Sequence, residues 1–101
     1  MGIDLYRVSE WNERQDYLGD PKSVLPALLD RARARSWELV KYIDPYGDTV
    51  FNHLQTSTLL AEFRLLEEYC RSEEERAWLA DAVALIAQSG EVHTYIKLIG
   101  D

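Results

Sequence analysis

Two segments with the composition of β-strands enclose a long stretch with helical periodicity, and this arrangement limits the fold more than any other feature of the chain. Residues 37–52 and 92–99 are rich in aromatic and β-branched side chains, which favour strands. Between them, apolar residues recur every three or four positions, as on the buried face of a helix. A chain that combines strands and helices in this way is predicted to form an α+β domain.

The helical stretch divides at Ser72. Apolar side chains spaced by four, three and four residues predict a helix over residues 58–71; they are Leu59, Phe63, Leu66 and Cys70. Ser72 followed by Glu75 is a capping box, and three glutamates in one first turn complement a helix dipole. We therefore expect a second helix from Ser72 to about Ser89, with Gly90 as its left-handed stop, and the two helices form a helical hairpin.

The first third of the chain contains a strand and two shorter helices by the same reasoning. Alternating residues over 3–8 predict a strand, and helical spacing over residues 10–18 predicts a short helix after Ser9. Ser23 is predicted to cap a further helix that has Pro26 in its first turn and ends near Arg35.

A tight turn is expected in the middle of the chain. Residues 37–44 alternate like a strand, and Asp44 to Gly47 carry the residue preferences of a type I turn. Residues 49–51 would then return as a short strand, and the last strand would lie beside residues 37–44. The complete prediction is a single α+β domain over residues 1–101. It has a three- or four-stranded, mostly antiparallel sheet with helices, including the C-terminal helical hairpin, packed on one face.

The charge of the chain bears on its partners. The net charge is −7, and residues 1–55 contribute −2 while residues 56–101 contribute −5 by count. Binding to phosphate backbones needs clustered cations, yet Arg31, Arg33 and Arg35 do not share one helix face. We expect no nucleic-acid partner, and the charge mildly favours a basic protein partner, although solubility alone also accounts for it.

Composition places further limits on location. The single cysteine, Cys70, cannot form an internal disulfide and occupies an apolar helical position, which suits a buried thiol in a reducing compartment. The first residues lack the apolar run of a signal peptide, and no later run approaches the length of a membrane span. The expectation is a cytoplasmic protein with no membrane partner.

Polar residues at the central turn raise the question of chemistry. Asp44 and Asp48 flank the turn, and His53 follows, so oxygen and nitrogen ligands or an acid–base pair could be assembled here. The spacing matches no recognised metal loop. A turn capped by Asp44, with Asp48 in solvent, explains the same residues more simply, so no catalytic residue, metal or cofactor is assigned.

A second polar row lies in the last predicted strand. Period-two spacing places Glu91, His93, Tyr95 and Lys97 on one face. Such a row suits a protein-binding face or a solvated sheet face, and a proton-transfer row is a weaker reading.

Two segments carry a resemblance. Asp44-Pro-Tyr-Gly-Asp-Thr-Val-Phe-Asn-His-Leu-Gln55 and His93-Thr-Tyr-Ile-Lys-Leu-Ile-Gly-Asp101 together resemble a group of small bacterial proteins with no known activity. The likeness covers roughly residues 37–101 by the span of these segments. The resemblance implies a bacterial origin, and it implies no particular activity. The likeness to immunity-type proteins is one of size, acidity and mixed α/β design.

These observations favour a non-catalytic bacterial protein-binding module, an acidic immunity or antitoxin-like inhibitor of a basic partner protein. Its expected binding residues are Asp44, Tyr46, Asp48, Glu67, Glu68, Glu73, Glu74, Glu75, His93, Tyr95 and Lys97. The alternatives are a small metal-binding protein or hydrolase-like enzyme built on Asp44, Asp48, His53 and His93, and a homo-oligomer that pairs exposed strand edges, such as a homodimer.

Overall fold

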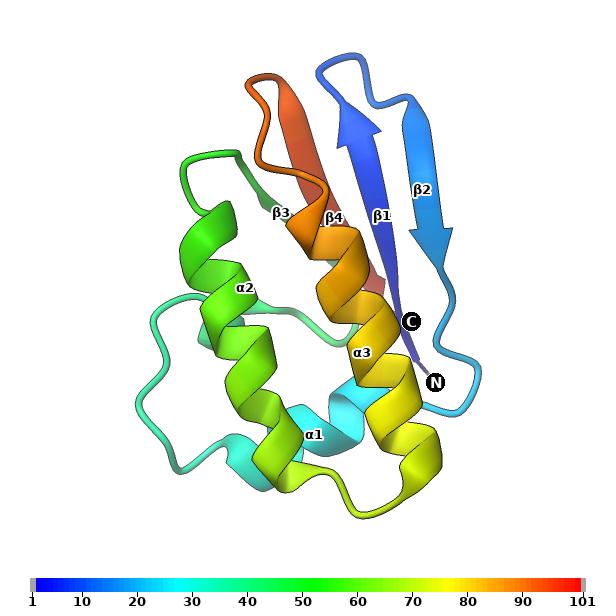
Figure 1. Cartoon of the computed structure of the whole chain (residues 1–101), viewed down its shortest axis with the longest axis vertical. Coiled ribbons are helices and arrows are strands. Elements are labelled where there is room, and N and C mark those ends of the chain that lie inside the picture. The colour runs from blue at the N-terminus through cyan, green and yellow to red at the C-terminus, as the bar shows by residue number, and fades with distance from the viewer. Residues whose placement is uncertain (1, 101) are drawn as a thin grey trace.

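A computed structural model describes residues 2–100 as a four-stranded sheet covered on one face by helices (Figure 1). In chain order the elements are β1 (Ile3–Ser9), β2 (Arg14–Leu18), α1 (Val24–Ala32), the 3-10 helix η1 (Val40–Tyr42), β3 (Asp48–Phe51), α2 (Thr56–Leu65), the 3-10 helix η2 (Leu66–Tyr69), α3 (Glu73–Ala87) and β4 (Thr94–Gly100). The predicted α+β architecture is confirmed.

The sheet has the strand order β2-β1-β4-β3, and each neighbouring pair is antiparallel. The two terminal strands, β1 and β4, pair over their whole length in the middle of the sheet, from Ile3 opposite Gly100 to Ser9 opposite Thr94. β1 and β4 are therefore the two central strands of the sheet, and β2 and β3 form its edges. The expectation that the last strand lies beside residues 37–44 is wrong.

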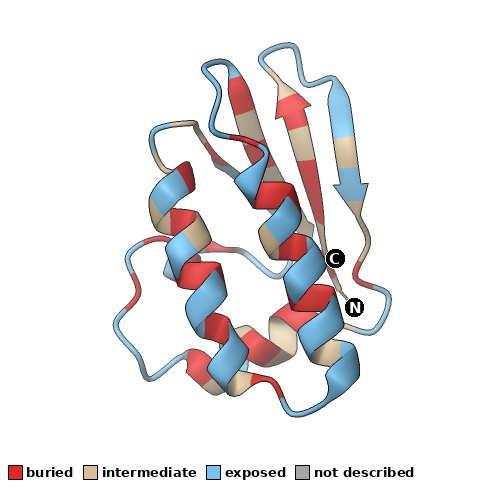
Figure 2. Ribbon diagram, in the orientation of Figure 1, coloured by how far each residue is buried: buried red, intermediate tan, exposed pale blue. Residues whose placement is uncertain are grey.

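The core lies between the inner face of the sheet and the helices (Figure 2). Ile96 and Leu98 of β4 are fully buried, as is Phe63 of α2, and α2 and α3 pack side by side above the sheet. Fully burying side chains of this size is worth about 1.5–3 kcal/mol each. The predicted burial of Cys70 is confirmed, since 8% of it is exposed, and burial raises the pKa of its thiol.

The helix predicted over residues 10–18 is wrong, because this segment forms a hairpin with β1. Ser9 Oγ accepts hydrogen bonds from the amides of Trp11 and Glu13, and Asn12 takes a left-handed conformation with φ 61°, which asparagine tolerates. Arg7 Nε then bonds across the strands to Asp16 Oδ2 at 2.6 Å. Cross-strand contacts of this kind stabilise a sheet, and a helix cannot make them.

The strand predicted over residues 37–44 is also wrong. The buried carboxylate of Glu62 accepts hydrogen bonds from the backbone amides of Glu38, Leu39 and Val40 at 2.6–3.0 Å. Those amides are therefore unable to join a sheet ladder, and the chain forms η1 instead. The predicted hairpin rim is absent, because β3 pairs with β4.

The predicted turn from Asp44 to Gly47 is confirmed. The Gly47 amide donates to the Asp44 carbonyl at 3.4 Å, and the Tyr46 amide donates to Asp44 Oδ1 at 2.9 Å. The side chain of Asp44 thus closes the turn, as expected, and β3 begins at Asp48.

The start of α1 differs from the prediction. Ser23 has φ 54° and makes no side-chain cap hydrogen bond. The buried Asp20 takes that role, because its carboxylate accepts from the amides of Val24 at 2.7 Å and Leu25 at 3.1 Å. The same carboxylate accepts from the Ile3 amide at 3.1 Å, so Asp20 joins the start of α1 to the start of β1. The helix ends at Ala32, before the predicted Arg35.

Helices are present in the two segments where they were predicted, but their bounds differ from the predicted ones by several residues. The first helix is α2 continued by η2. Ser72 caps α3 as predicted, with Ser72 Oγ accepting from the Glu75 amide at 3.1 Å. The stop at Gly90 is wrong, because no glycine among residues 2–100 has a positive φ. Within the same residues, no helix is both long and apolar enough to cross a membrane.

Candidate protein-binding surface

The outer face of the sheet, on the side opposite the helices, is rich in tyrosine. Strand register places Tyr6 opposite both Tyr17 and Lys97, and Val8 opposite Tyr95. The same register places Val50 opposite Lys97. We define the outer face by the side chains that share this side of the sheet: Asp4, Tyr6, Val8, Arg14, Tyr17, Asp48, Val50, Tyr95, Lys97 and Ile99.

A cluster of two tyrosines and an arginine covers the β1–β2 half of this face. The rings of Tyr6 and Tyr17 have centroids 4.9 Å apart, and the Arg14 guanidinium lies 4.2 Å from the Tyr6 centroid. Tyr6 is only 9% exposed, whereas Tyr17 is 59% exposed. The negative charge of the neighbouring Asp4 carboxylate raises the pKa of the Tyr17 phenol, and partial burial of the phenol raises it by a smaller amount. The contacts among these three side chains order the cluster, although no helix packs on this face of the sheet.

The predicted residues Tyr95 and Lys97 lie together on the outer face of β4, with half-buried side chains. Lys97 Nζ is 3.9 Å from Asp48 Oδ2 in β3 and 3.5 Å from Asn12 Oδ1 in the β1–β2 loop. Lys97 therefore lies between the edge strand β3 and the β1–β2 loop on the outer face. The period-two prediction is confirmed for this pair.

The predicted His93 lies before β4, with φ 68°. Its Nδ1 is 2.9 Å from Glu10 Oε2 in the β1–β2 loop, and Glu91 also precedes the strand. Glu91 and His93 therefore belong to the loop at the end of the face and do not extend the β4 row.

Sequence reasoning missed Trp11, Arg14 and Tyr17, because it placed residues 10–18 in a helix. Trp11 is 75% exposed in the loop that joins β1 and β2. The signal that could have found these residues is Asn12, a residue type suited to a left-handed loop position, between two short alternating runs.

The predicted residues near the central turn lie at the other end of β4. Asp48 is opposite Ile99, whereas His93 precedes Thr94, so about 20 Å of extended strand separates their positions along β4. Asp44 is committed to its turn, and Tyr46 is exposed at the tip. In the described part of the chain, no group of three or more His, Cys, Asp or Glu side chains is arranged to hold a metal ion. The metal or hydrolase alternative therefore has no assembled cluster there.

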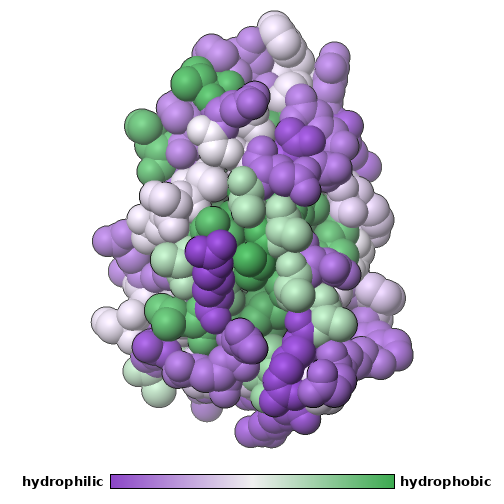
Figure 3. Space-filling view, in the orientation of Figure 1, coloured by the Kyte–Doolittle hydropathy of each residue, from purple (hydrophilic) through white to green (hydrophobic). Residues whose placement is uncertain are grey.

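Four of the five predicted glutamates form ion pairs within the chain. Glu68 pairs with Arg35, Glu73 with Arg76, and Glu74 with Lys22, at 2.6–3.0 Å. Figure 3 shows apolar side chains gathered over α2 and α3, with polar side chains around them. Because these acids already have cationic neighbours, this side of the molecule is less acidic than its glutamates suggest.

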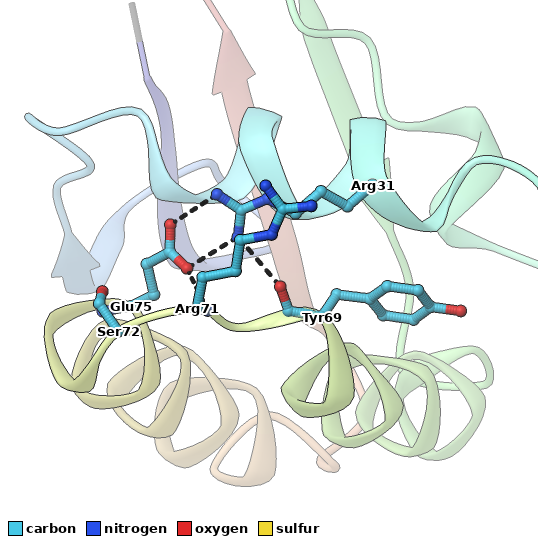
Figure 4. Close-up of polar contacts among 5 residues, drawn as sticks. All are labelled: Arg31, Tyr69, Arg71, Ser72 and Glu75. Carbon is cyan, nitrogen blue, oxygen red and sulfur yellow. Dashed lines mark hydrogen bonds and ion pairs between the residues drawn. The ribbon is translucent and has the colours of Figure 1, made fainter.

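The fourth paired glutamate, Glu75, holds three elements together (Figure 4). Its two carboxylate oxygens accept from Arg31 of α1 at 2.8 and 3.0 Å, and Oε1 also accepts from the Arg71 amide at 2.7 Å. Arg31 donates in addition to the Tyr69 carbonyl of η2 at 3.0 Å. The hydrogen bonds from Arg31 and from the Arg71 amide lower the pKa of Glu75 to about 2. Glu75 is therefore engaged within the fold.

No family model, curated protein or solved structure matches this chain. The assignment of function therefore depends on the geometry of the surfaces.

Proposed function

We propose that this protein is a non-catalytic protein-binding module that contacts its partner with the outer face of the sheet. The observation that carries the proposal is the composition of that face. Tyrosine and arginine are the residue types enriched where protein interfaces have their strongest contacts, and Tyr17 and Val50 keep more than half of their surface exposed.

Charge at the edges of this face supports a basic partner. Asp4 and Asp48 both lie opposite Ile99 at one end, and Glu10 and Glu13 lie near the other end in the β1–β2 loop. These four acids outnumber the two cations of the face, Arg14 and Lys97, the second of which lies 3.9 Å from Asp48. An aromatic centre with a small excess of acidic residues around it suits a partner that has an apolar centre and a basic rim. An inhibitor of immunity or antitoxin type is the finer form of the proposal, and the net charge of −7 supports it.

The test is capture of partners from a bacterial lysate, with the bound proteins identified by mass spectrometry. The test variant is Tyr17→Ala with Tyr95→Ala, which removes two rings from the outer face. The matched control is Leu54→Ala, which removes an apolar side chain that is 77% exposed outside this face. We expect one dominant partner that the wild type and the control retain and the test variant loses.

A second arm separates the outer face from the acidic surface. Glu67, Glu73 and Glu74 are exposed on η2 and α3, and the charge reversals Glu67→Lys, Glu73→Lys and Glu74→Lys alter that surface alone. If this variant loses the partner and the tyrosine variant captures it fully, the binding site would be the acidic surface and not the outer face. Retention of the partner by both would contradict the proposal. A mass in solution of two chains would favour the homodimer alternative.

A further inference from the structure

A groove of about 700 Å³ lies where the end of α1 meets η1 and the turn that precedes β3. This volume is within the range of sites for single small molecules. The groove shares no lining residue with the outer face. Its lining combines apolar and aromatic side chains with three cations and one acid: Pro26, Leu29, Asp30, Arg33, Arg35, Ser36, Trp37, Val40, Lys41, Ile43, Pro45 and Tyr46.

The floor of the groove is apolar and fixed in place. Trp37, Val40 and Ile43 are each less than 10% exposed. Trp37 Nε1 donates to the Ala32 carbonyl at 2.8 Å, and the Glu62 carboxylate holds the backbone that follows Trp37. A site whose shape exists before the ligand arrives loses little free energy in ordering itself.

The charge of the groove is opposite to that of the whole chain. The lining residues include three cations, Arg33, Arg35 and Lys41, and one acid, Asp30, although the chain carries a net charge of −7. Arg35 is engaged, with its guanidinium 2.6 Å from Glu68 and 5.3 Å from the Trp37 ring.

The other two cations are available to a ligand. The Arg33 side chain is 80% exposed, and its contact with Asp30 is 3.4 Å long, which is a weak surface pair. Lys41 forms no ion pair with any residue between positions 2 and 100, and its Nζ lies 5.1 Å from the Tyr42 ring.

We propose that this groove binds a small organic anion. An aromatic or aliphatic body packs on the floor at Trp37 and Ile43, and the carboxylate, sulfonate or phosphate group lies beside Arg33 and Lys41. The exposed ring of Tyr46 lines the groove and covers the body of the ligand. The positive charges of Arg33 and Lys41 favour an anion, and the volume of the groove suits a single small molecule.

Two fluorescent probes of matched shape test the proposal on the full chain. Anilinonaphthalene sulfonate carries an aromatic body and one negative charge, and N-phenylnaphthylamine carries the same body without the charge. We expect the sulfonate to bind at least about tenfold more tightly, a difference within reach of one or two charged contacts. Equal affinities would overturn the proposal.

Charge reversal locates the bound probe. In the variant with Arg33→Glu and Lys41→Glu we expect the sulfonate to lose at least about tenfold in affinity, while the neutral probe is unchanged. The control is Arg64→Glu, an exposed arginine of α2 outside the groove, and it leaves both affinities unchanged. A sulfonate affinity that resists the double reversal, or falls equally in the control, would overturn the assignment.

A third variant tests the aromatic wall. Tyr46→Ala removes a ring that is 75% exposed, so the fold tolerates it, and we expect both probes to bind more weakly. Unchanged binding of both would overturn the placement of the ligand. Failure of any of these tests leaves capture of a protein by the outer face unaffected, because the two sites use different residues.

Discussion

The inner and outer faces of the sheet are built from the same four strands and have opposite character. In β4, Ile96 and Leu98 point inward and are fully buried, whereas Tyr95 and Lys97 alternate with them on the outside and remain half-buried. Because successive side chains of a strand point to opposite faces of the sheet, neighbouring residues in β4 belong to different faces. The inner positions stabilise the fold, and the outer positions are free to specify a contact.

The two faces also differ in how they are secured. On the inner side, carboxylates form hydrogen bonds between elements. Asp20 connects α1 to β1, and Glu75 connects α3 to α1. The outer face is ordered by contacts among its own side chains, such as the Tyr6 and Tyr17 rings. This contrast predicts which substitutions alter stability and which alter binding.

The largest effect is expected from truncation on the inner face. Ile96→Ala removes a fully buried side chain and leaves a cavity, so the free energy of unfolding should fall by about 3 kcal/mol. Urea unfolding followed by circular dichroism measures it. A loss below about 1 kcal/mol would mean that the helices do not pack tightly on this face.

Removal of the buried Asp20 carboxylate is expected to cost nearly as much. Asp20→Ala deprives the amides of Ile3, Val24 and Leu25 of their acceptor, and we expect a loss of about 3 kcal/mol, because unsatisfied buried donors are costly. Hydrogen exchange should also quicken at the Ile3 amide. The control is Asp30→Ala, whose side chain is 73% exposed and which should change stability by less than about 0.5 kcal/mol. Similar losses for both variants would contradict the role of Asp20.

A smaller effect is expected from the protonation of Glu75. Its pKa is about 2 in the folded protein, below the ordinary value of 4.5, so its contribution to stability is complete above about pH 5 and is lost as the pH falls toward 2. Because the pair with Arg31 lies partly at the surface, we expect about 1–2 kcal/mol. Unfolding measured between pH 2 and 5 should show a shallower slope for Glu75→Gln than for the wild type. Parallel slopes would show that other acids cause the change.

The smallest effect on stability is expected on the outer face. Tyr95→Ala removes a half-buried ring and should lower the free energy of unfolding by about 1 kcal/mol or less, while partner capture weakens. The same urea titration, compared with Ile96→Ala on the adjacent residue, tests the difference between the faces. A stability loss equal to that of Ile96→Ala would show that Tyr95 is a core residue.

Local patterns were sufficient for much of the fold. The spacing of Leu59, Phe63 and Leu66 located α2 and η2, and Ser72 with Glu75 located the start of α3. Alternation identified β1 and β4. In the candidate surface, the same alternation placed Tyr95 and Lys97 on one face, because it depends only on the geometry of a single strand.

The failures occurred where distant residues decide the local structure. Residues 10–18 fit a helix by spacing, but their partners are in β1, where Arg7 bonds to Asp16. Tyr17 was therefore missed as a surface residue. The predicted glutamates could not be ranked either, since three of them, Glu68, Glu74 and Glu75, pair with cations that are remote in sequence: Arg35, Lys22 and Arg31.

The sequence by itself determined the α+β class, the helical pair with its Ser72 cap, and the division of β4 into a buried side and a polar side. These properties depend on the periods of single helices and strands, which the order of residues expresses directly. Only the tertiary structure decided the strand order, the loss of a strand at residues 37–44 to the Glu62 carboxylate, and the gathering of tyrosines on the outer face. Each of these depends on hydrogen bonds or contacts between residues far apart along the chain, whose free energy no local pattern contains.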